Sequence, residues 1–524
     1  MKKLTIFILL LILFFPLREN YRILGLFPFP SRSHVVMFQA LMKGLAEKGH
    51  EVDVLSHFPQ EKPPPRYNDI SVRGTVPINN FSIKFIQEHL GNAYQSTEHL
   101  LTHLTESICT EVLNSSYVRE LKNTKKKYDL IIIEIYATDC FFAFAYKFKI
   151  PVIGITSSVT VSWGNRIGNP DNPSYIPNYI MPFSGRMNFI ERMRNTLAFL
   201  TTKRLETATH TISDIIAREQ FGPDLPRISV LAYNVSLMLI NSHFSINYAR
   251  PAVSNFIEVG SLHIKPRNLL PKHLEEVLNI GSQYEGVICL SMGSIVRSET
   301  FSRDKLQAFF HVFKGMSYQI IWKANKEQMP KDLDIPPNIH FEQWLPQKDV
   351  LCHPNVKLFI AHGGLLGLQE AVYCGVPLLG IPQFSDQELN LKMSETLNLG
   401  MIIKYEDLTE KRITEALMLL LFDNKYKENV KRLSKILKDQ PNPPMDTAIY
   451  WIEYVIRHKG SFQLRALGVD LPWYQHHSLD VIITLLVLFT TIIGSTCCTY
   501  SAMGKIMSVC RAKRKARQDI IRGC

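Results

Sequence analysis

Residues 341–387 read FEQWLPQKDVLCHPNVKLFIAHGGLLGLQEAVYCGVPLLGIPQFSDQ, and this stretch decides the interpretation of the whole chain. Within it, the apolar run Leu358–Ala361 has the character of a buried strand and ends at His362 and two glycines. The segment Leu365–Tyr373 follows directly and has the character of a helix. A glycine turn at a helix start leaves backbone N–H groups unpaired, and the helix dipole favours negative charge there. The stretch therefore predicts a phosphate-binding turn.

The polar residues around this turn have the chemistry that a nucleotide sugar requires. Trp344 offers a flat apolar face for a base ring. Gln347 and Glu370 can hydrogen-bond ribose hydroxyls, and Asp386 and Gln387 can bond the hydroxyls of a sugar. Any one of these residues alone would more often belong to the core or the surface. As an ordered set, they predict a nucleotide-sugar site.

The stretch resembles the donor-binding signature of the UDP-glycosyltransferase family, in its membrane-bound, UDP-glucuronosyltransferase-like animal form. The residues around Phe27–His34 and at Thr138–Cys140 resemble insect members most, and the resemblance extends from Tyr21 to about residue 515. It implies the α/β fold of GT-B type, in which two Rossmann-like doubly wound domains face a cleft. It also implies a UDP-sugar as co-substrate, with no metal.

Composition places the chain among globular proteins with room for two ordinary domains, at 524 residues, 46% hydrophobic and 20% charged. The net charge of +12 is unevenly spread, since residues 501–524 hold seven basic residues and one acidic residue. A basic tail can indicate nucleic-acid binding. Here it directly follows Val481–Gly504, which contains no charge, so it fits the cytoplasmic flank of a membrane span instead. A buried core helix of that length would normally carry one polar face.

The N-terminus predicts entry into the secretory pathway. Lys2 and Lys3 precede the apolar run Leu4–Leu17, which fits a signal peptide over residues 1–20, although an uncleaved anchor is the alternative. A signal, a long body and one late span predict a single-pass type I protein with a lumenal catalytic body. Residence in the endoplasmic reticulum membrane rests on the resemblance. Three sequons suit that compartment and make glycosylation candidates of Asn80, Asn114 and Asn234.

The nine cysteines do not predict a disulfide framework. Four lie in the expected span or tail, and the other five are scattered and odd in number. No CxxC pair indicates zinc. The five cysteines of the body are Cys109, Cys140, Cys289, Cys352 and Cys374.

Alternating strand and helix patterns predict two parallel sheets. The first half begins with a strand–helix–strand unit, continues through a Pro-rich loop at 60–80, and reaches an interdomain linker at 251–272. The expected strands and helices are Tyr21–Phe27, Val35–Lys48, Val52–Ser56, Leu130–Glu134, Pro151–Ile155, Gly286–Ser291, Arg303–Lys314, Gln319–Lys323, Leu358–Ala361, Pro377–Gly380 and Gly400–Lys404. The expected domains are 21–250 for acceptor binding and 273–460 for UDP-sugar binding, then a juxtamembrane segment at 461–479, a span at 480–504 and a basic tail at 505–524.

The first βα turn ends at His34, where an open α/β sheet places its ligands. His34 also lies in the first helical turn, where the dipole favours a neutral imidazole suited to a general base. The alternative is a histidine that begins the helix and has no catalytic role. However, the histidine that follows this Pro-Ser-x-Ser turn matches the family's catalytic base. Asp139, in the family's Thr-Asp-Cys context, is the predicted orienting carboxylate, with Glu134 as the competing candidate.

These residues predict an inverting transfer in which His34 removes the acceptor proton and fixed dipoles stabilise the leaving diphosphate. The predicted donor contacts are Ser291, Gly293, Ser294, Trp344, Gln347, His362, Gly363, Gly364, Glu370, Asp386 and Gln387. The chain departs from the family at Leu366, where many members have a phosphate-contacting Asn. A metal held by Asp332-Leu-Asp334 is not expected, because no supporting carboxylate accompanies that triplet.

The predicted function is transfer of a hexose to a hydroxyl of small lipophilic acceptors, for detoxification or conjugation, with glucose favoured and glucuronate possible. A membrane-lipid or sterol glycosyltransferase and a non-catalytic lipophile carrier are the alternatives. Loop aromatics between 157 and 190 either form a lipophilic acceptor wall or pack on their own core. They are Trp163, Tyr175, Tyr179 and Phe183. The sequence leaves the acceptor and the oligomeric state open.

Overall fold

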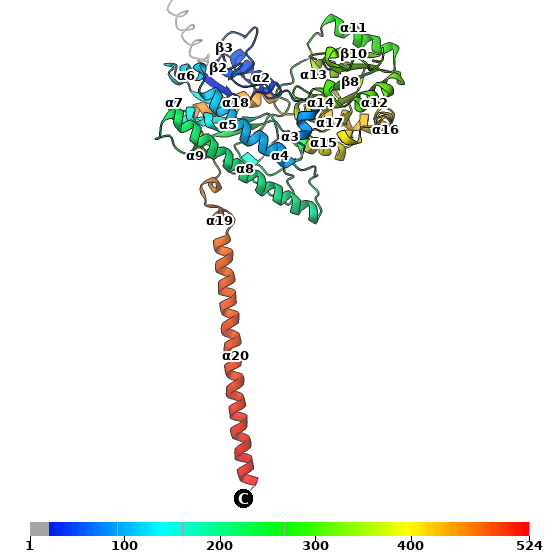
Figure 1. Ribbon diagram of the computed structural model, residues 1–524. Coiled ribbons are helices and arrows are strands. Elements are labelled where there is room, and N and C mark those ends of the chain that lie inside the picture. The colour runs from blue at the N-terminus through cyan, green and yellow to red at the C-terminus, as the bar shows by residue number, and fades with distance from the viewer. Residues whose placement is uncertain (1–19, 92, 160–161, 267, 523–524) are drawn as a thin grey trace, which may run out of the picture. The chain divides into compact units, whose positions relative to one another are not determined.

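The computed structural model describes residues 20–91, 93–159, 162–266 and 268–522, and the chain divides into two units at residues 466 and 467 (Figure 1). The first unit contains both sheets. The second contains one long helix. The predicted signal peptide at 1–20 lies, except for its last residue, outside the described residues.

The first sheet has seven strands, all parallel, in the order β3-β2-β1-β4-β5-β6-β7. Its central strands are apolar and buried on both faces, as a parallel sheet covered by helices requires. The order reverses direction between β1 and β4, which makes that pair the topological switch point. The strands are β1 Arg22–Phe27, β2 Glu51–Ser56, β3 Tyr67–Ser71, β4 Leu130–Glu134, β5 Val152–Thr156, β6 Leu237–Ile240 and β7 Phe256–Glu258.

The second sheet repeats this design with six parallel strands in the order β10-β9-β8-β11-β12-β13. Its switch point lies between β8 and β11. The strands are β8 Val287–Ser291, β9 Gln319–Lys323, β10 Ile339–Glu342, β11 Val356–Ala361, β12 Leu378–Gly380 and β13 Gly400–Ile402. Two parallel sheets of Rossmann type confirm the predicted fold class.

Helices cover both sheets. Those in the first half of the chain are α2 Arg32–Lys48, α3 Ile83–His89, α4 Ala93–Glu98, α5 Leu104–Leu113, α6 Ser116–Lys122, α7 Ala143–Phe148, α8 Phe189–Phe221, α9 Ile228–Ala232 and α10 Phe244–Asn247. Those that follow are α11 Lys272–Ile280, α12 Arg303–Lys314, α13 Gln347–Leu351, α14 Leu365–Cys374, α15 Gln387–Thr396, α16 Glu410–Phe422, α17 Asn424–Lys438 and α18 Pro444–Arg457.

Three elements differ from the sequence-based prediction. The expected loop at 60–80 contains β3, whose polar sequence YNDIS suits an edge strand and lacks an apolar alternation. The expected linker at 251–272 contains β7, the other edge strand of the first sheet. The 33-residue helix α8 was not expected, although Asn188 and Glu191 form a capping box at its start.

The two halves of the first unit also exchange helices. Helix α18, expected in the second domain, packs on the first sheet, because Ile449 and Ile452 share an apolar cluster with β1 and α2. In the opposite direction, Ile83 and Ile86 of α3 pack in the apolar cluster of β8 and β9. The Phe81 N–H donates to the Ile295 carbonyl at 2.6 Å, which ties the segment before α3 to the loop after β8.

The expectation of no disulfide framework was wrong, because four of the five cysteines in the body pair. Cys109 bonds to Cys140, and Cys352 bonds to Cys374. One bond joins α5 to the turn after β4, and the other joins the ends of α13 and α14. Cys289 stays a buried free thiol. The odd number of cysteines in the body is explained by two disulfides and one free thiol, and each disulfide lies within one half of the chain.

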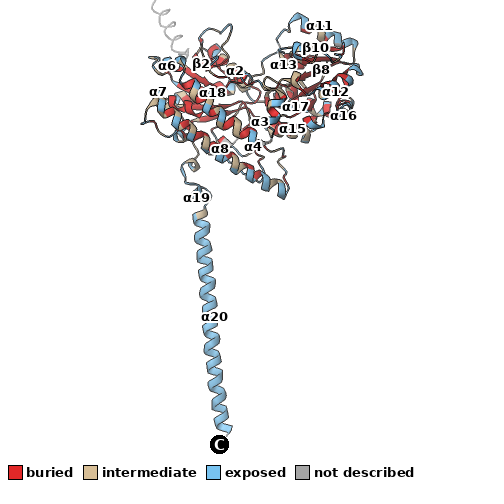
Figure 2. Ribbon diagram, viewed as in Figure 1, coloured by how far each residue is buried: buried red, intermediate tan, exposed pale blue. Residues whose placement is uncertain are grey.

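The second unit contains α19 (Trp473–His476) and α20 (Leu479–Arg522). Among the described residues, α20 is the one helix long and apolar enough to cross a membrane. It is exposed along nearly its whole length (Figure 2). The expected span at 480–504 lies within it, and most of the basic tail continues the same helix.

We predict that Gln369 contributes to the stability of the first unit. Its buried side chain accepts from the Ser261 N–H at 3.1 Å and donates to the Asn241 carbonyl at 3.3 Å, which joins α14 to the first half. Gln369→Met leaves two buried backbone groups unpaired and should cost about 2 kcal/mol or more. Thermal unfolding measures this as a lower Tm. The exposed Gln328→Met is the control, and an equal Tm for both variants would contradict the prediction.

Candidate active site

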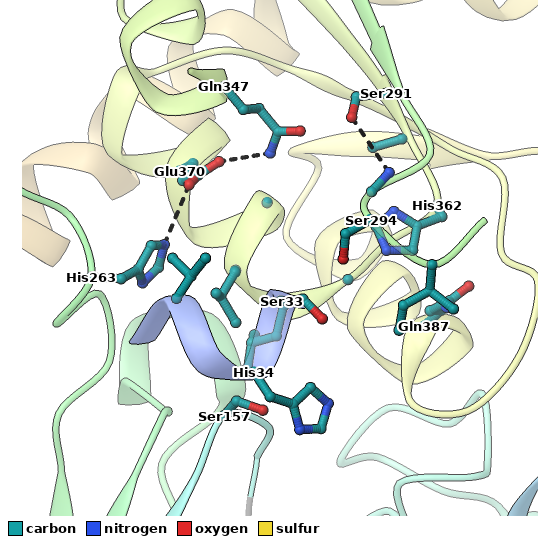
Figure 3. Close-up of a pocket in the computed structure, with 18 of the residues that line it drawn as sticks. Ser33, His34, Ser157, His263, Ser291, Ser294, Gln347, His362, Glu370 and Gln387 are labelled. Atoms are coloured by element: carbon teal, nitrogen blue, oxygen red, sulfur yellow. Dashed lines mark hydrogen bonds and ion pairs between the residues drawn. The ribbon is translucent and has the colours of Figure 1, made fainter. Parts of the chain in front are cut away.

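A cavity of about 400 Å³ lies where the carboxyl ends of the two sheets face each other (Figure 3). Residues that follow β1, β4 and β5 line one side of it. The last residue of β9 and residues that follow β8, β11 and β12 line the other. Open parallel sheets bind ligands at their switch points, and here two such points share one cavity.

His34 lines this cavity from the first turn of α2. Its Nδ1 lies 2.6 Å from Glu134 Oε1 at the end of β4. An Nδ1–H that donates to this carboxylate leaves Nε2 as the unprotonated nitrogen of a neutral ring. The ring stacks on Phe29 at 4.7 Å and meets the edge of Tyr136 at 5.2 Å, which fixes its plane. The contacts therefore hold a proton acceptor at the cavity wall.

The predicted pairing of His34 with Asp139 is corrected by this contact, because the carboxylate that His34 meets belongs to Glu134. Asp139 instead receives two hydrogen bonds from Arg166, at 2.8 and 2.9 Å, and lies 3.1 Å from His210 Nε2. The chain turns away from the sheet after β4, so a residue five positions later lies in the core. Burial alone would raise the pKa of Asp139, but Arg166 and His210 hold that pKa well below its ordinary value.

Glu134 is fully buried, and its environment changes its basicity. Burial raises the pKa of the Glu134 carboxyl, and the hydrogen bond from His34 opposes part of that rise. A carboxylate with a raised pKa accepts the Nδ1 proton more strongly, so it stabilises the imidazolium that forms when Nε2 takes a proton. The pair thus has the composition of a general base and its orienting group.

Across the cavity, two predicted glycines enclose the ring of His362. A Cβ on Gly293 would lie 2.5 Å from that ring, and one on Gly364 would lie 2.6 Å from its Nε2. Gly293 also has φ 76°, which disfavours any other residue. Burial, with help from Lys323, lowers the pKa of His362 to about 4. His362 therefore offers a hydrogen bond but no positive charge at neutral pH.

This wall also carries free hydrogen-bond donors and one cation that was not predicted. Helix α14 begins after Gly364, and no capping side chain accepts a hydrogen bond from its first N–H groups. The Ser294 hydroxyl is buried without a partner. Lys323, at the end of β9, donates from Nζ to the Gly293 carbonyl at 2.6 Å, and burial lowers its pKa. Its position at a strand's carboxyl end was the signal that could have identified it.

The expected ribose contacts lie together. The Gln347 amide donates to Glu370 Oε2 at 2.6 Å, and His263 lies 3.5 Å from the other oxygen of that carboxylate (Figure 3). All three line the cavity. His263 comes from the segment expected to be the linker and was not predicted. The structure thus holds the Glu370 carboxylate in place at the cavity wall.

Trp344 lines the cavity and is half exposed. The Arg32 guanidinium lies 4.6 Å from the centre of one of its rings, and Lys323 Nζ lies 5.2 Å away. Both contacts are cation–π interactions. A base that stacks here would share the indole with these cations or displace one of them.

The two residues expected to bind the sugar have other partners in the structure. Asp386 Oδ2 accepts from the Ser158 hydroxyl at 2.6 Å, which joins the loop after β5 to α15. Gln387 Oε1 accepts from the backbone N–H groups of Gln383 and Phe384, at 2.8 and 3.3 Å. Both residues line the cavity, but the Gln387 carbonyl serves mainly to hold its own loop.

Of the loop aromatics considered for an acceptor wall, Tyr179 alone lines this cavity. Trp163 and Phe183 are buried, and Tyr175 lines a second, smaller cavity. Other large apolar residues line the cavity, and two of them, Phe29 and Tyr136, contact His34. They include Phe29, Phe81, Leu100, Tyr136 and Phe384. Leu366, the departure from the family pattern, lines the cavity and also packs against the apolar cluster of β1 and α2.

No group of three or more potential metal-ligating side chains occurs in the part of the chain that the structure describes. The Asp332-Leu-Asp334 triplet is used in exposed ion pairs. Asp332 pairs with Arg303, and Asp334 pairs with Lys314 at 3.0 Å.

Known proteins resemble this chain over most of its length. The family model described as "UDP-glucoronosyl and UDP-glucosyl transferase" matches residues 66–512. "UDP-glycosyltransferase UGT5" of Dactylopius coccus is 39% identical over 484 residues, 90% of each chain. "UDP-glucosyltransferase 2" of the same organism is 37% identical over 474 residues, 89% of this chain and 90% of that protein. "UDP-glucuronosyltransferase 2B1" of Rattus norvegicus is 29% identical over 510 residues, 90% of this chain and 93% of that protein.

A solved structure shares the architecture. Glycosyltransferase VinC, determined in complex with DTDP, matches with a TM-score of 0.57 at 16% identity, over 83% of this chain and 100% of that chain. At this identity the likeness concerns the fold alone, and it confirms the GT-B arrangement of two Rossmann-type halves.

We predict that Asp139 serves stability. Asp139→Asn leaves the buried Arg166 with weaker compensation and should cost about 3 kcal/mol at neutral pH, the low end for breaking a buried ion pair. Because the folded state lowers the pKa of the Asp139 carboxyl, its ionised form stabilises the fold at pH values above its ordinary pKa of 3.8. This contribution is lost as the pH falls below that value. The Tm difference from wild type should therefore hold from pH 8 to pH 5 and narrow only below about pH 4. A difference that vanished by pH 6 would contradict this assignment, and the exposed Asp332→Asn is the control.

Proposed function

The chain belongs to the family of UDP-glucoronosyl and UDP-glucosyl transferases, and from this premise we propose that it is an inverting enzyme that glycosylates small lipophilic alcohols or phenols. It is a UDP-glycosyltransferase, so the donor is a UDP-sugar. The proposal concerns the stereochemistry, the sugar, the acceptor and the residues that act.

The contact between His34 and Glu134 carries the proposal. It leaves His34 Nε2 as the acceptor of a proton at one wall of the cavity. The opposite wall holds the start of α14, the Ser294 hydroxyl and Lys323, which together suit a diphosphate. A proton acceptor facing an anion site is the arrangement that a direct displacement at a glycosyl carbon requires.

The reaction follows from these positions. The acceptor hydroxyl gives its proton to His34 Nε2 while its oxygen forms a bond to the anomeric carbon. The bond from that carbon to the diphosphate oxygen breaks on the opposite face, so the configuration inverts. Glu134 stabilises the imidazolium through Nδ1–H. UDP leaves, and the negative charge that develops on its diphosphate is stabilised by the N–H donors at the start of α14 and by Lys323.

The donor side of the cavity supports a role in UDP-sugar binding for the second half of the chain. Glu370, held by Gln347, offers carboxylate oxygens to ribose hydroxyls. The uracil base can stack on the Trp344 ring once Arg32 or Lys323 moves off part of it. Asp386 is positioned by Ser158 for the sugar. Glucose is the sugar we favour, because a close relative bears the name UDP-glucosyltransferase 2.

The acceptor side supports a lipophilic substrate. Phe29, Tyr136 and Tyr179 surround the approach to His34 from the first half, and Phe384 adds an aromatic ring from the second. Such a wall gives an apolar acceptor its affinity and leaves the hydroxyl as its one polar group near the base. A small lipophilic molecule fits a cavity of about 400 Å³ shared with a donor better than a whole membrane lipid does.

Membrane anchoring through α20, with the body in the lumen of the endoplasmic reticulum, completes the proposal. The helix has the length and composition of a span, and a basic segment follows its apolar part. The two disulfides suit an oxidising compartment. Asn80, Asn114 and Asn234 are exposed, as glycosylation requires.

We expect His34→Ala to lower kcat by about 10²–10⁴-fold, the usual contribution of a general base, while UDP binding measured by calorimetry persists. Glu134→Gln should lower kcat over a similar range, because an amide cannot stabilise the imidazolium. In the wild-type enzyme, activity should fall as pH drops through the raised pKa of Glu134. Asp139→Asn should keep the pH profile of the wild type, so an equal loss of kcat in Asp139→Asn and Glu134→Gln would contradict the assignment.

The sugar and the acceptor class are tested by one product assay. UDP-glucose and UDP-glucuronate are each offered with a panel of phenols and with a membrane sterol, and products are identified by mass spectrometry. We expect glucosides of the phenols. Glucuronides would revise the sugar, sterol glycosides alone would favour the lipid-modifying alternative, and donor binding without any product would favour a carrier.

A further inference from the structure

We propose that the first half of α8 lies flat in the surface of a lipid bilayer, with its apolar side chains among the acyl chains. This part of the helix carries several large apolar side chains that are exposed. Their exposed fractions are 68% for Phe189, 49% for Ile190, 47% for Met193, 59% for Leu197 and 57% for Leu200.

The spacing of these residues gathers them on one side of the helix. Phe189, Met193, Leu197 and Leu200 follow one another at intervals of four, four and three residues, which is the repeat of one helical face. Ile190 widens this face by one position. The result is a continuous apolar stripe over the first three turns and more.

The side of α8 that faces the protein mixes polar residues with the apolar Ala198 and Leu205, whereas its large apolar side chains in this stretch face outward. Asn195 and Thr202 are buried there. The Asn195 side chain accepts from the Asn178 N–H at 2.7 Å and donates to the carbonyls of Pro173 and Ile176 at 2.7 and 2.8 Å. These bonds fix the rotation of the helix, so the apolar stripe is held outward and cannot turn into the core.

Charge beside the stripe indicates what covers it. Residues 186–204 contain five basic residues and one acidic residue. The basic residues are Arg186, Arg192, Arg194, Lys203 and Arg204. Arg192 and Arg194 flank the stripe on either side by helical position, and Arg192 lies over the Phe189 ring at 6.0 Å. An apolar stripe with basic flanks fits acyl chains bordered by phosphate headgroups.

A bilayer suits this face better than a second copy of the chain does. Two such faces in contact would bring like charges together on both sides of the stripe. The inference rests on the proposed anchoring by α20, which is separated from Ala466, the end of the first unit, by 12 residues. Twelve extended residues reach at most about 40 Å, so the first unit remains near any membrane that α20 crosses.

Membrane contact at α8 would also deliver acceptors. The segment that Asn195 holds, from Pro173 to Asn178, leads directly to Tyr179 at the cavity wall. Lipophilic acceptors concentrate in bilayers. A helix lying in the headgroup region therefore brings the acceptor side of the cavity toward the phase in which they dissolve.

The test is photocrosslinking of the full-length chain in phosphatidylcholine bilayer discs that contain a lipid with a photoreactive group on its acyl chain. After irradiation and trypsin, lipid adducts are located by mass spectrometry. We expect adducts on peptide 195–203, which contains Leu197 and Leu200, and on α20. Peptide 413–425 of α16, with exposed Met418 and Leu419, is the matched control and should stay unmodified.

A double variant adds a second comparison. Leu197→Glu with Leu200→Glu should lower the adduct yield on the first half of α8 on the order of tenfold, while Met418→Glu with Leu419→Glu leaves it unchanged. Adducts on α20 alone would overturn the inference and leave the anchoring intact. No adducts on α20 would overturn the anchoring and the inference with it. Crosslinks between 195–203 of two chains would also overturn it, in favour of a second copy.

Discussion

The hydrogen bond between His34 and Glu134 is the contact on which the rest of the site depends, and it exists because β1 and β4 are neighbours. His34 lies just beyond one strand and Glu134 ends the other, at the point where the first sheet reverses its strand order. In the second sheet, β8 and β11 occupy the same topological position and lead to Ser294 and His362. The cavity therefore lies where two switch points face one another.

Burial is the largest cause of the pKa shifts of three groups around the cavity. It lowers the pKa of His362 and Lys323, which disfavours positive charge, and it raises the pKa of Glu134. An incoming diphosphate would oppose the lowering of the Lys323 pKa and so stabilise the cationic form of that side chain. The Trp344 ring, shared with Arg32 and Lys323, lies next to this change.

The fold, and the cavity that most of the proposed donor residues line, were predictable because their signals are local. Apolar strand runs, glycines and helix starts identified β1, β4, β8 and β11 to within two residues. Elements that depend on partners were not predictable, such as the polar edge strand β3 and the helix α8. The choice between Glu134 and Asp139 depended on where the chain turns after β4, and the family-like Thr-Asp-Cys context favoured the wrong residue. The leucine at position 366, where many family members have Asn, is explained only by the structure, in which it packs against the apolar cluster of β1 and α2.

The interleaving of α3 and α18 bears on how new specificities arise by recombination. An exchange of the first half between two relatives at a single point near residue 250 would separate α18 from the sheet on which it packs. It would also place a foreign α3 against β8 and β9. A functional chimera must therefore keep residues 444–457 with the first half and residues 81–90 with the second. The natural units of inheritance in this chain are discontinuous in sequence, and gene shuffling that respects them needs four crossovers or more.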